Sequence, residues 1–481
     1  MTKTSTSTPT GAARPGAIGV RNPCTGREDY WFVPPTEAGL AARCRELRAA
    51  QPAWRGMGVE ARCAAMLRLA DAFDARLGLL VQPLTVDTGR TRVAAGEIAS
   101  VVRNIRRWCG RAPALVVTEE FDSKVMPSLR IGQQLVPYPL VGVISPWNFP
   151  FALSFIDAIP ALLAGCAVIV KPSEVTPRFV EPLRQVIDSV PEVARVLGFV
   201  QGGGATGAQL IGQVDAICFT GSVATGRKVA VAAAERFIPA FLELGGKDPA
   251  IVLPSADLDK ASDGILRVSC TASGQVCLAL ERVYVHESVH DRLVDLLVEK
   301  GSRLGLAYPS LDDGPIGPMI FDRQADIIDA QLDDAVAKGA TIRCGGKSRN
   351  LGGGRYVPAT VVTGVDHGMK LMSEETFGPV TPVMPFRTVD EAVALANETV
   401  FGLSGAVFAG TLEEARAVAE RINAGGMSLN DAGLTRETFE AEKNSFGYSG
   451  IGGSRHGDAG LLRFFRKQAL FAQRGAPATI G

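Results

Sequence analysis

The chain has 481 residues, more than the roughly 250 to 300 that one hydrophobic core supports, so we expect two large domains. Its 50 basic and 50 acidic residues balance, which leaves no evident electrostatic attraction to nucleic acids or anionic membranes. This composition favours a small-molecule partner that is neutral or weakly charged.

Nine cysteines are scattered along the chain, odd in number and never spaced as CxxC, so the sequence indicates neither a disulfide framework nor a zinc site. Residues 1–16 are rich in Ser, Thr and Pro but lack the apolar core of a secretory signal. No later stretch reaches the ~20 apolar residues that cross a bilayer. We therefore expect a cytoplasmic protein without a metal site and with a frayed N-terminal segment.

Two amphipathic helices come first in the chain. Leu40, Cys44 and Leu47 fall at helical spacing after a start at Thr36, and a second helical pattern runs through Phe73. Beyond residue 137, short apolar runs alternate with helical stretches. Because these runs show no polar alternation, they predict parallel strands covered on both faces, at 140–145, 167–172, 197–201 and 215–221.

The same pattern starts again after the glycine pair at 245–246. Apolar runs at 249–254 and 282–287, with helices from about residue 258 and over 293–304, predict a second α/β unit. Residues 128–140 predict a strand pair without a helix, and residues 466–472 predict a lone strand. Strands without a local sheet often pair with another domain or subunit.

Two glycine-rich segments follow predicted strands. GGGATG at 202–207 has the form GxGxxG but lacks the acidic residue ~20 positions later, so it is either a dinucleotide fingerprint or a simple glycine turn. GSVATGRK at 221–228 lacks the Lys-Ser/Thr of a phosphate loop, which argues against NTP hydrolysis. Gly221 and Ser222 instead lead into a helix whose N-terminus suits a pyrophosphate, or they form a plain turn.

Lys171 and Glu174 end the predicted strand at 167–172, the edge of a parallel sheet where ligands bind. An acidic side chain there accepts hydrogen bonds from ribose hydroxyls and repels a 2′-phosphate. The alternative is a solvated charge pair at i, i+3. This position therefore indicates a nucleotide ribose site only if other motifs agree.

Three further residues are candidates for chemistry. Asn148 lies in a rigid turn between two prolines, and its amide can either stabilise an oxyanion or bind the backbone. Glu243, between leucines, is either a general base or an ion-pair partner of Lys247. Cys277 is either a small buried residue or a nucleophile, which needs an activating base, cation or dipole.

Taken together, these motifs resemble the aldehyde dehydrogenase superfamily over almost the whole chain. The elements occur in the family's order, and Glu243 and Cys277 are 34 positions apart, as in that family. The elements are PWNFP, KPSE, FTGSVATG, LELGGK, GQVC, EETFGPV and SGIGGSR. The resemblance implies an α/β fold with a Rossmann-type NAD-binding domain (1–118 and 141–244), an α/β catalytic domain (245–450) and a small β bridging or oligomerisation element (119–140 and 451–481).

The resemblance also implies the site. Cys277 would be the nucleophile, Glu243 the general base, and Asn148 with the Cys277 N–H the oxyanion hole. The reaction would be the oxidation of an aldehyde to an acid through a thiohemiacetal and a thioester, and the glutamate favours hydrolysis over transfer to coenzyme A. NAD, with NADP possible, would be bound by Ser145, Trp147, Lys171, Glu174, Gly204, Gly221, Ser222, Leu244, Glu375 and Phe377.

The region 427–455 departs from the family's pattern and has two extra residues at 453–454, so the substrate does not follow from the resemblance. Phe149, Ile156, Leu278 and Phe446 predict an apolar pocket for an aliphatic or aromatic aldehyde. The alternatives are a semialdehyde whose carboxylate binds Arg455 or Lys443, a coenzyme A-acylating enzyme and a relative without activity. We expect a homodimer or homotetramer.

Overall fold

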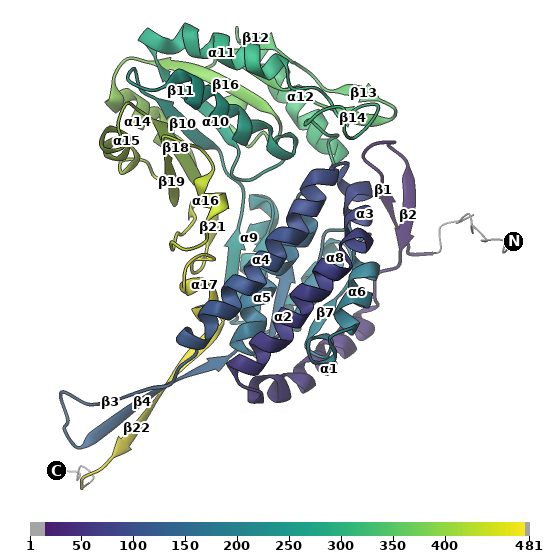
Figure 1. Cartoon of the computed structure of the whole chain (residues 1–481), viewed down its shortest axis with the longest axis vertical. Helices are drawn as coiled ribbons and strands as arrows, with labels where there is room; N and C mark the ends of the chain where they lie inside the picture. The colour runs from purple at the N-terminus through teal and green to yellow at the C-terminus, as the bar shows by residue number, and fades with distance from the viewer. Residues whose placement is uncertain (1–14, 477–481) are drawn as a thin grey trace, which may run out of the picture.

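The computed structural model describes residues 15–476, so most of the predicted N-terminal segment lies outside the described residues. Two α/β bodies are stacked along the long axis, and a narrow β arm projects from one end (Figure 1). Within the described range, no helix combines the length and the apolarity needed to cross a bilayer.

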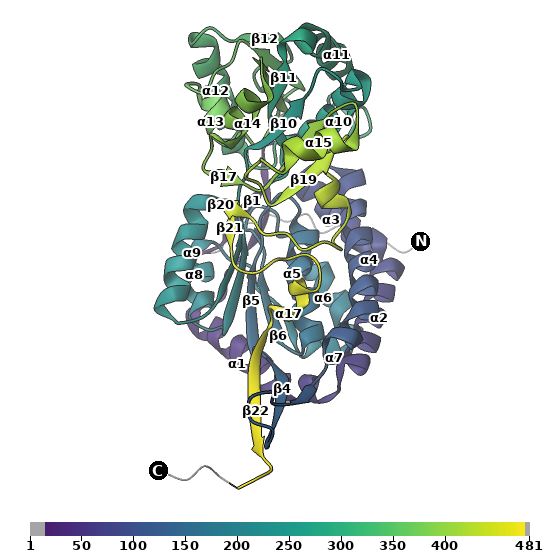
Figure 2. The same ribbon diagram turned by 90° about the vertical axis from the view of Figure 1, so that its left-hand side faces the viewer.

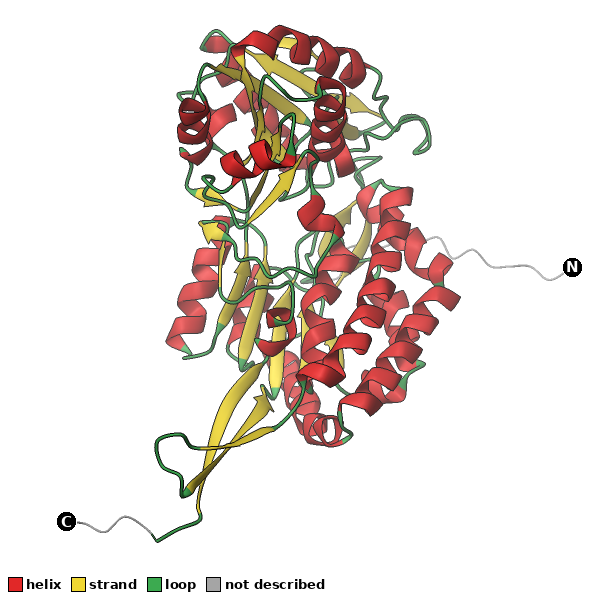
Figure 3. Cartoon of the chain, turned by 60° about the vertical axis from the view of Figure 1, so that its left-hand side comes forward, coloured by secondary structure: helices red, strands yellow, loops and turns green. Residues whose placement is uncertain are grey.

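The first body is a six-stranded sheet in the order β21-β9-β8-β5-β6-β7, parallel except for β21. Every residue of β5, β6 and β8 is buried, as their unbroken apolar runs predict, because helices cover both faces (Figure 3). The helices and strands up to β9, without the arm strands β3 and β4, are β1 (Ile18–Arg21), β2 (Glu28–Phe32), α1 (Glu37–Gly56), α2 (Val59–Ala75), α3 (Leu77–Thr88), α4 (Thr91–Leu115), β5 (Leu140–Ile144), α5 (Pro150–Ala164), β6 (Ala167–Lys171), α6 (Val180–Asp188), α7 (Pro191–Ala194), β7 (Leu197–Phe199), α8 (Gly204–Ile211), β8 (Ala216–Thr220), α9 (Val223–Glu235) and β9 (Ala240–Glu243).

The second body is a seven-stranded sheet in the order β12-β15-β16-β11-β10-β18-β19, with only β12 antiparallel. Separate apolar clusters include buried residues of its helices and strands. The elements are β10 (Asp248–Val252), α10 (Leu258–Cys270), η1 (Thr271–Gly274), β11 (Leu280–His286), η2 (Glu287–Val289), α11 (His290–Ser302), α12 (Asp322–Ala337), β12 (Thr341–Cys344), β13 (Arg349–Leu351), β14 (Gly354–Tyr356), β15 (Thr360–Thr363), α13 (Lys370–Ser373), β16 (Val380–Phe386), α14 (Val389–Asn397), β17 (Phe401–Gly402), β18 (Ser404–Phe408), α15 (Leu412–Ala419), β19 (Gly426–Leu429), α16 (Leu434–Glu437) and β20 (Phe446–Gly447).

The arm is an antiparallel sheet of β3 (Glu119–Asp122), β4 (Leu129–Pro137) and β22 (Phe465–Gln473), with β4 in the centre (Figure 1). Figure 2 shows β4 and β22 extending away from the first body. The predicted strand pair at 128–140 is wrong: β4 is one long strand that ends at Pro137, and β5 begins at Leu140, directly after Pro139. The predicted tail strand pairs with β4 along its whole length.

After the second body the chain returns to the first through β21 (Gly450–Ile451) and α17 (Ala459–Leu462). β21 pairs with β9, and Gly450 lies opposite Glu243 in this ladder. The edge of the first sheet is therefore completed by a segment that follows the second body. This places Glu243 where the two bodies meet.

Candidate active site

A cavity of about 430 Å³ lies between the two bodies. Asn148, Glu243 and Cys277 all line it, although they come from three separate segments. Apolar side chains form much of the remaining wall. The other lining residues are Val93, Gly96, Glu97, Ser100, Val101, Asn104, Phe149, Ala152, Leu153, Ile156, Thr220, Leu244, Thr271, Val276, Leu278, Leu403, Thr435, Arg436, Glu437, Phe439, Lys443, Arg455 and His456.

Cys277 lies in the loop between η1 and β11 and is partly exposed to the cavity. Burial raises the pKa of its thiol, the carboxyl groups of Glu375 and Asp248 also raise it, and Lys443 opposes the shift, so that the pKa lies at about 12. The thiol is therefore protonated at neutral pH in the protein alone. A nucleophilic role requires a base or a cation that acts when the ligands are bound.

Asn148 is buried directly after β5. Its Nδ2 donates a hydrogen bond to the carbonyl of Gln275 at 2.9 Å, which leaves the second N–H of the amide free. Among residues 15–476 the backbone N–H of Cys277 has no acceptor. The two free donors belong to the same cavity wall and can bind one oxyanion.

Glu243 ends β9, and its Oε2 accepts a hydrogen bond from Ser445 Oγ at 2.8 Å. The alternative of an ion pair with Lys247 is wrong. The ammonium group of Lys247 is fully buried and binds Glu281 Oε2 and Thr376 Oγ1, each at 2.8 Å. The carboxylate of Glu243 is therefore available to accept a proton from a molecule in the cavity.

Lys171 and Glu174 lie at the carboxyl end of β6. Lys171 Nζ donates to Gly202 O at 2.6 Å and to Pro172 O at 3.0 Å, and pairs with Glu174 Oε2 at 3.3 Å. The charge pair considered from the sequence is thus present, while the Glu174 carboxylate stays half-exposed. A Cβ built on Gly204 would meet nothing within 4 Å, so open space beside these residues fits a nucleotide ribose.

Gly221 and Ser222 precede α9, which begins at Val223, next to the predicted start at residue 224. Ser222 Oγ caps the helix by accepting from Thr225 N at 3.3 Å. A Cβ at Gly221 would lie 2.6 Å from the ring of Phe219. The 13-residue helix therefore presents an open N-terminus, which suits a pyrophosphate.

Glu375 and Phe377 lie in the second body, in the loop between α13 and β16. Gly246 N donates to Glu375 Oε1 at 3.1 Å, and a Cβ on Gly245 would lie 2.6 Å from the same oxygen, so the glycine pair admits this carboxyl group. Burial raises the pKa of Glu375 to about 8. The ring of Phe377 packs edge-on against Trp147, with centroids 5.4 Å apart.

The other two predicted cofactor residues are held by the protein. The hydroxyl of Ser145 lies 2.8 Å from that of Ser154. Leu244 lines the cavity, and its N–H donates to Ser449 O at 2.8 Å. These side chains can therefore shape the site, whereas the polar groups open to a cofactor belong to Glu174 and Glu375.

Phe149, Ile156 and Leu278 line the cavity, as predicted for an apolar pocket, but Phe446 does not. Phe446 is 40% exposed because β20 pairs with β17, where it lies opposite Gly402. The prediction for Phe446 is therefore wrong.

Sequence reasoning missed two parts of the wall. The first is one face of α4, from Val93 to Asn104, whose helical spacing is visible in the sequence although nothing there links it to the site. The second is Thr435 to Phe439, within the region that departs from the family's pattern. His456 also lines the cavity, and burial with nearby cations lowers its pKa to about 3.

The two candidate carboxylate anchors differ. Arg455 is buried and donates from Nε and Nη2 to Asp157 at 3.1 and 2.8 Å, and from Nη2 to Thr220 Oγ1 at 2.6 Å. Lys443 also lines the cavity, yet no carboxylate within residues 15–476 forms a salt bridge with it. Lys443 is therefore the cation that a ligand can reach.

Residues 11–470 match the model of the aldehyde dehydrogenase family. A protein of Mycolicibacterium smegmatis, provisionally named succinate-semialdehyde dehydrogenase (NADP+), is 35% identical over 455 residues, which cover 94% of this chain and 87% of that protein. A protein of Methylomonas sp. named 4,4'-diapolycopene aldehyde oxidase is 35% identical over 460 residues, covering 93% and 84%.

Solved structures are also similar. A provisionally named aldehyde dehydrogenase PutA from Anabaena variabilis shows a TM-score of 0.95 and 54% identity, covering 96% of this chain and 99% of that one. Betaine aldehyde dehydrogenase from Staphylococcus aureus in complex with NAD+ shows a TM-score of 0.90 and 28% identity, covering 96% and 95%. The predicted α/β fold class is confirmed by these similarities.

Proposed function

Because the chain belongs to the aldehyde dehydrogenase family, as its motifs predicted, we propose that Cys277, Glu243 and Asn148 perform the family's reaction here. The protein is an NAD(P)-dependent aldehyde dehydrogenase. The observation that carries the assignment of these residues is that all three line one cavity from three separate segments.

In the first half of the reaction, the Cys277 thiol loses its proton to water, its sulfur adds to the aldehyde carbon, and the carbonyl oxygen becomes an oxyanion. The free N–H of Asn148 and the backbone N–H of Cys277 stabilise that charge. NAD, which Glu174 and Glu375 would help to hold, would supply the acceptor for the hydride that leaves the thiohemiacetal. The acyl group then remains on Cys277 as a thioester.

In the second half, Glu243 takes a proton from a water molecule that attacks the thioester. Its hydrogen bond from Ser445 orients the carboxylate but leaves one oxygen free. The same two donors stabilise the second oxyanion, and the acid and the Cys277 thiol are released. An enzyme with a carboxylate here hydrolyses its acyl intermediate.

The test is Glu243→Gln, which preserves the shape and removes the base. We expect one burst of about one NADH per subunit and an acyl adduct on Cys277 detectable by intact mass spectrometry. Cys277→Ala should show neither, while Glu192→Gln on the surface of α7 should turn over normally. Steady turnover in Glu243→Gln, or acyl-CoA formation on addition of coenzyme A, would overturn hydrolysis through Glu243.

For the cofactor, the proposed NAD-binding domain comprises residues 1–118 and 141–244, and the catalytic domain comprises 245–450. Glu174 supports a preference for NAD, because its half-exposed carboxylate repels a 2′-phosphate. Glu174→Gln should lower the ratio of kcat/KM for NAD over that for NADP by about tenfold. A ratio that does not change would remove Glu174 from cofactor selection.

The proposed bridging element, residues 119–140 and 451–481, supports a homodimer or homotetramer. Its arm exposes Phe121, Leu470 and Phe471 at 44–66%. Exposed apolar side chains on an unpaired sheet edge favour association with a second copy. Phe471→Asp should reduce the mass measured by light scattering.

We propose an apolar aliphatic or aromatic aldehyde as substrate, since Phe149, Ile156 and Leu278 line the cavity. The second candidate is an aldehyde with a distal carboxylate, which the unpaired ammonium of Lys443 favours. Hexanal and 6-oxohexanoate have the same chain length, and only the second carries a distal carboxylate. Comparing them therefore separates the two candidates.

If the carboxylate is recognised, Lys443→Met should raise the KM for 6-oxohexanoate at least about tenfold and leave that for hexanal within about twofold. Lys338→Met on the surface of the second body should change neither. If the wild-type enzyme prefers hexanal and Lys443→Met changes both substrates equally, the apolar aldehyde remains the substrate class.

A further inference from the structure

Arg90 lies at the corner between α3 and α4 and is 6% exposed, outside the lining of the cavity. Its Nη1 donates to the carbonyl of Ala272 at 3.2 Å and its Nη2 to the carbonyl of Asn148, while Nε is buried without a partner. No carboxylate within residues 15–476 forms a salt bridge with it. The guanidinium also lies over the ring of Phe149, 5.2 Å from its centroid. Burial lowers its pKa to about 10, and the nearby carboxyl group of Glu97 opposes this shift. Burying a cation without a salt bridge is costly, so its contacts with two carbonyls require a reason.

The two carbonyls belong to the loops that carry the oxyanion donor and the nucleophile. Ala272 and Ser273 have φ values of 53° and 59°, in the left-handed region that is unfavourable for residues other than glycine. This segment precedes Cys277 by only a few residues. Contacts from outside the loop, such as the one from Arg90, keep it in this conformation.

A second bridge joins the same two loops. The side chain of Asn148 donates to Gln275 O at 2.9 Å, and the Oε1 of Gln275 accepts from Ile320 N at 2.9 Å. The backbone of Asn148 is thus held by Arg90 and its side chain by Gln275. Together the two bridges set the direction of the free N–H of Asn148 relative to the Cys277 loop.

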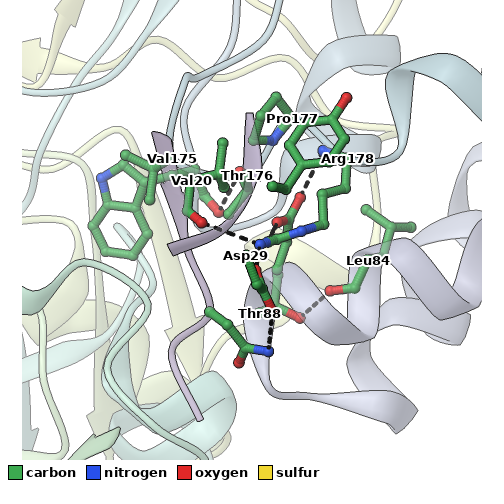
Figure 4. Close-up of polar contacts among 12 residues, drawn as sticks. Val20, Asp29, Leu84, Thr88, Val175, Thr176, Pro177 and Arg178 are labelled. Atoms are coloured by element: carbon green, nitrogen blue, oxygen red, sulfur yellow. Dashed lines mark hydrogen bonds and ion pairs between the residues drawn. The ribbon is translucent and has the colours of Figure 1, made fainter. Parts of the chain in front are cut away.

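The corner that carries Arg90 is itself anchored. Asp87 near the end of α3 is fully buried, accepts from Arg178 N at 2.9 Å and forms an ion pair with the Arg178 side chain. Figure 4 shows Arg178 beside Asp29 and Val20. The carbonyl of Val20 accepts a hydrogen bond from Arg178 Nη2 at 3.2 Å, and the same nitrogen pairs with Asp29. Arg90 therefore extends from a fixed base, three residues beyond this ion pair.

We propose that Arg90 is a positioning residue that holds the oxyanion donors of Asn148 and Cys277 on a common point. The inference rests on the proposed function, because it takes Asn148 as an oxyanion donor. The planar guanidinium reaches two carbonyls at once, whereas the single nitrogen of a lysine cannot hold both in the same geometry. Arg90 acts through Asn148 and Ala272, since it does not line the cavity.

The test compares Arg90→Lys and Arg90→Met with Arg62→Lys. Arg62 is a matched control because it is buried, donates to the carbonyls of Leu163 and Arg55 at 3.1 and 3.0 Å, and lies outside the cavity wall. Arg90→Lys should lower kcat about 100-fold with little change in the KM for NAD. Arg62→Lys should stay within about threefold.

Two readouts separate positioning from a structural role. Alkylation of Cys277 by iodoacetamide develops no oxyanion, so it should stay within about threefold in Arg90→Lys. In an Asn148→Ala background, Arg90→Lys should lower kcat less than about threefold further, because both changes remove the same interaction. Arg90→Lys alone carries the test if Arg90→Met does not fold.

If the losses of kcat in Arg90→Lys and Asn148→Ala are additive in the double variant, the positioning role of Arg90 is overturned. It is also overturned if the rates of alkylation and turnover fall in parallel in Arg90→Lys. Turnover that persists unchanged in Asn148→Ala would instead overturn the proposed oxyanion role of Asn148. The failure of the inference and the failure of the proposed function therefore give different results.

Discussion

The inner and outer ends of the cavity are built in different ways. At the inner end, Asn148, Glu243 and Cys277 each lie within four residues of the strands β5, β9 and β11. At the outer end, the wall comes from one face of α4 and from residues 435–443, where α16 has only four residues. The proposed catalytic residues thus lie next to strands, whereas the rest of the wall, which we expect to contact the substrate, comes from a helix face and a loop.

This difference separates two kinds of information in the sequence. A residue next to a strand in a parallel sheet is placed by backbone hydrogen bonds, so a short motif fixes its surroundings. A loop can change its length and residues without disturbing that ladder. The inner end therefore indicates the reaction, and the outer end selects the substrate.

The largest expected effect concerns Asp157, which holds the returning segment of the outer wall. Its carboxylate binds both Arg455 and Arg463, and all three side chains are at most 8% exposed. Asp157→Asn leaves two buried cations without a counter-charge and should lower the free energy of unfolding by about 3–5 kcal/mol, measured by urea denaturation.

The control is Asp71→Asn, since Asp71 pairs with Arg106 at 3.3 Å on the exposed surface. It should change the free energy of unfolding by no more than about 0.5 kcal/mol. An equally small effect of Asp157→Asn would mean that the outer wall does not depend on this buried ion pair. The result would contradict the view that the outer end of the cavity is anchored separately from the inner end.

The next effect tests whether the two ends are electrically independent. Because the pKa of Cys277 is raised to about 12, its thiolate fraction grows with pH throughout the neutral range. Alkylation by iodoacetamide without NAD should therefore rise about tenfold per pH unit from pH 7 to pH 9, with no plateau. A plateau near pH 9 would contradict the raised pKa.

Lys443 of the outer end lowers the pKa of Cys277, against the effect of burial. Lys443→Met should thus slow alkylation at pH 8 by about threefold, because removing the ammonium group lowers the thiolate fraction of Cys277. An unchanged rate would show that the ammonium group acts only on substrates, and the two ends would be independent.

The sequence was sufficient for the parts that depend on local patterns. Unbroken apolar runs predicted β5, β6 and β8, and short motifs predicted which of nine cysteines faces the cavity with Glu243. Phe446 shows where this reasoning stops. Its apolar ring suggested the pocket, but its direction is set by pairing with β17, about 45 residues earlier in the chain.

Arg90 shows a second limit. Its two acceptors lie 58 and 182 positions away, and both are backbone carbonyls. Any residue type carries a carbonyl, so no motif in the sequence marks these contacts. Contacts of this kind become visible only when the three segments are assembled.

The smallest expected effect tests the outer end alone. Phe439 lines the cavity, and its ring is tilted against that of His456 with the ring centroids 4.7 Å apart. Phe439→Ala should lower kcat/KM for a long apolar aldehyde such as decanal about tenfold, while acetaldehyde stays within about twofold because it does not reach the ring. Phe237→Ala, which removes a ring that is 98% exposed, should change neither. If both aldehydes lose activity equally in Phe439→Ala, then residue 439 supports the catalytic geometry, and the division of the cavity into two ends is wrong at this position.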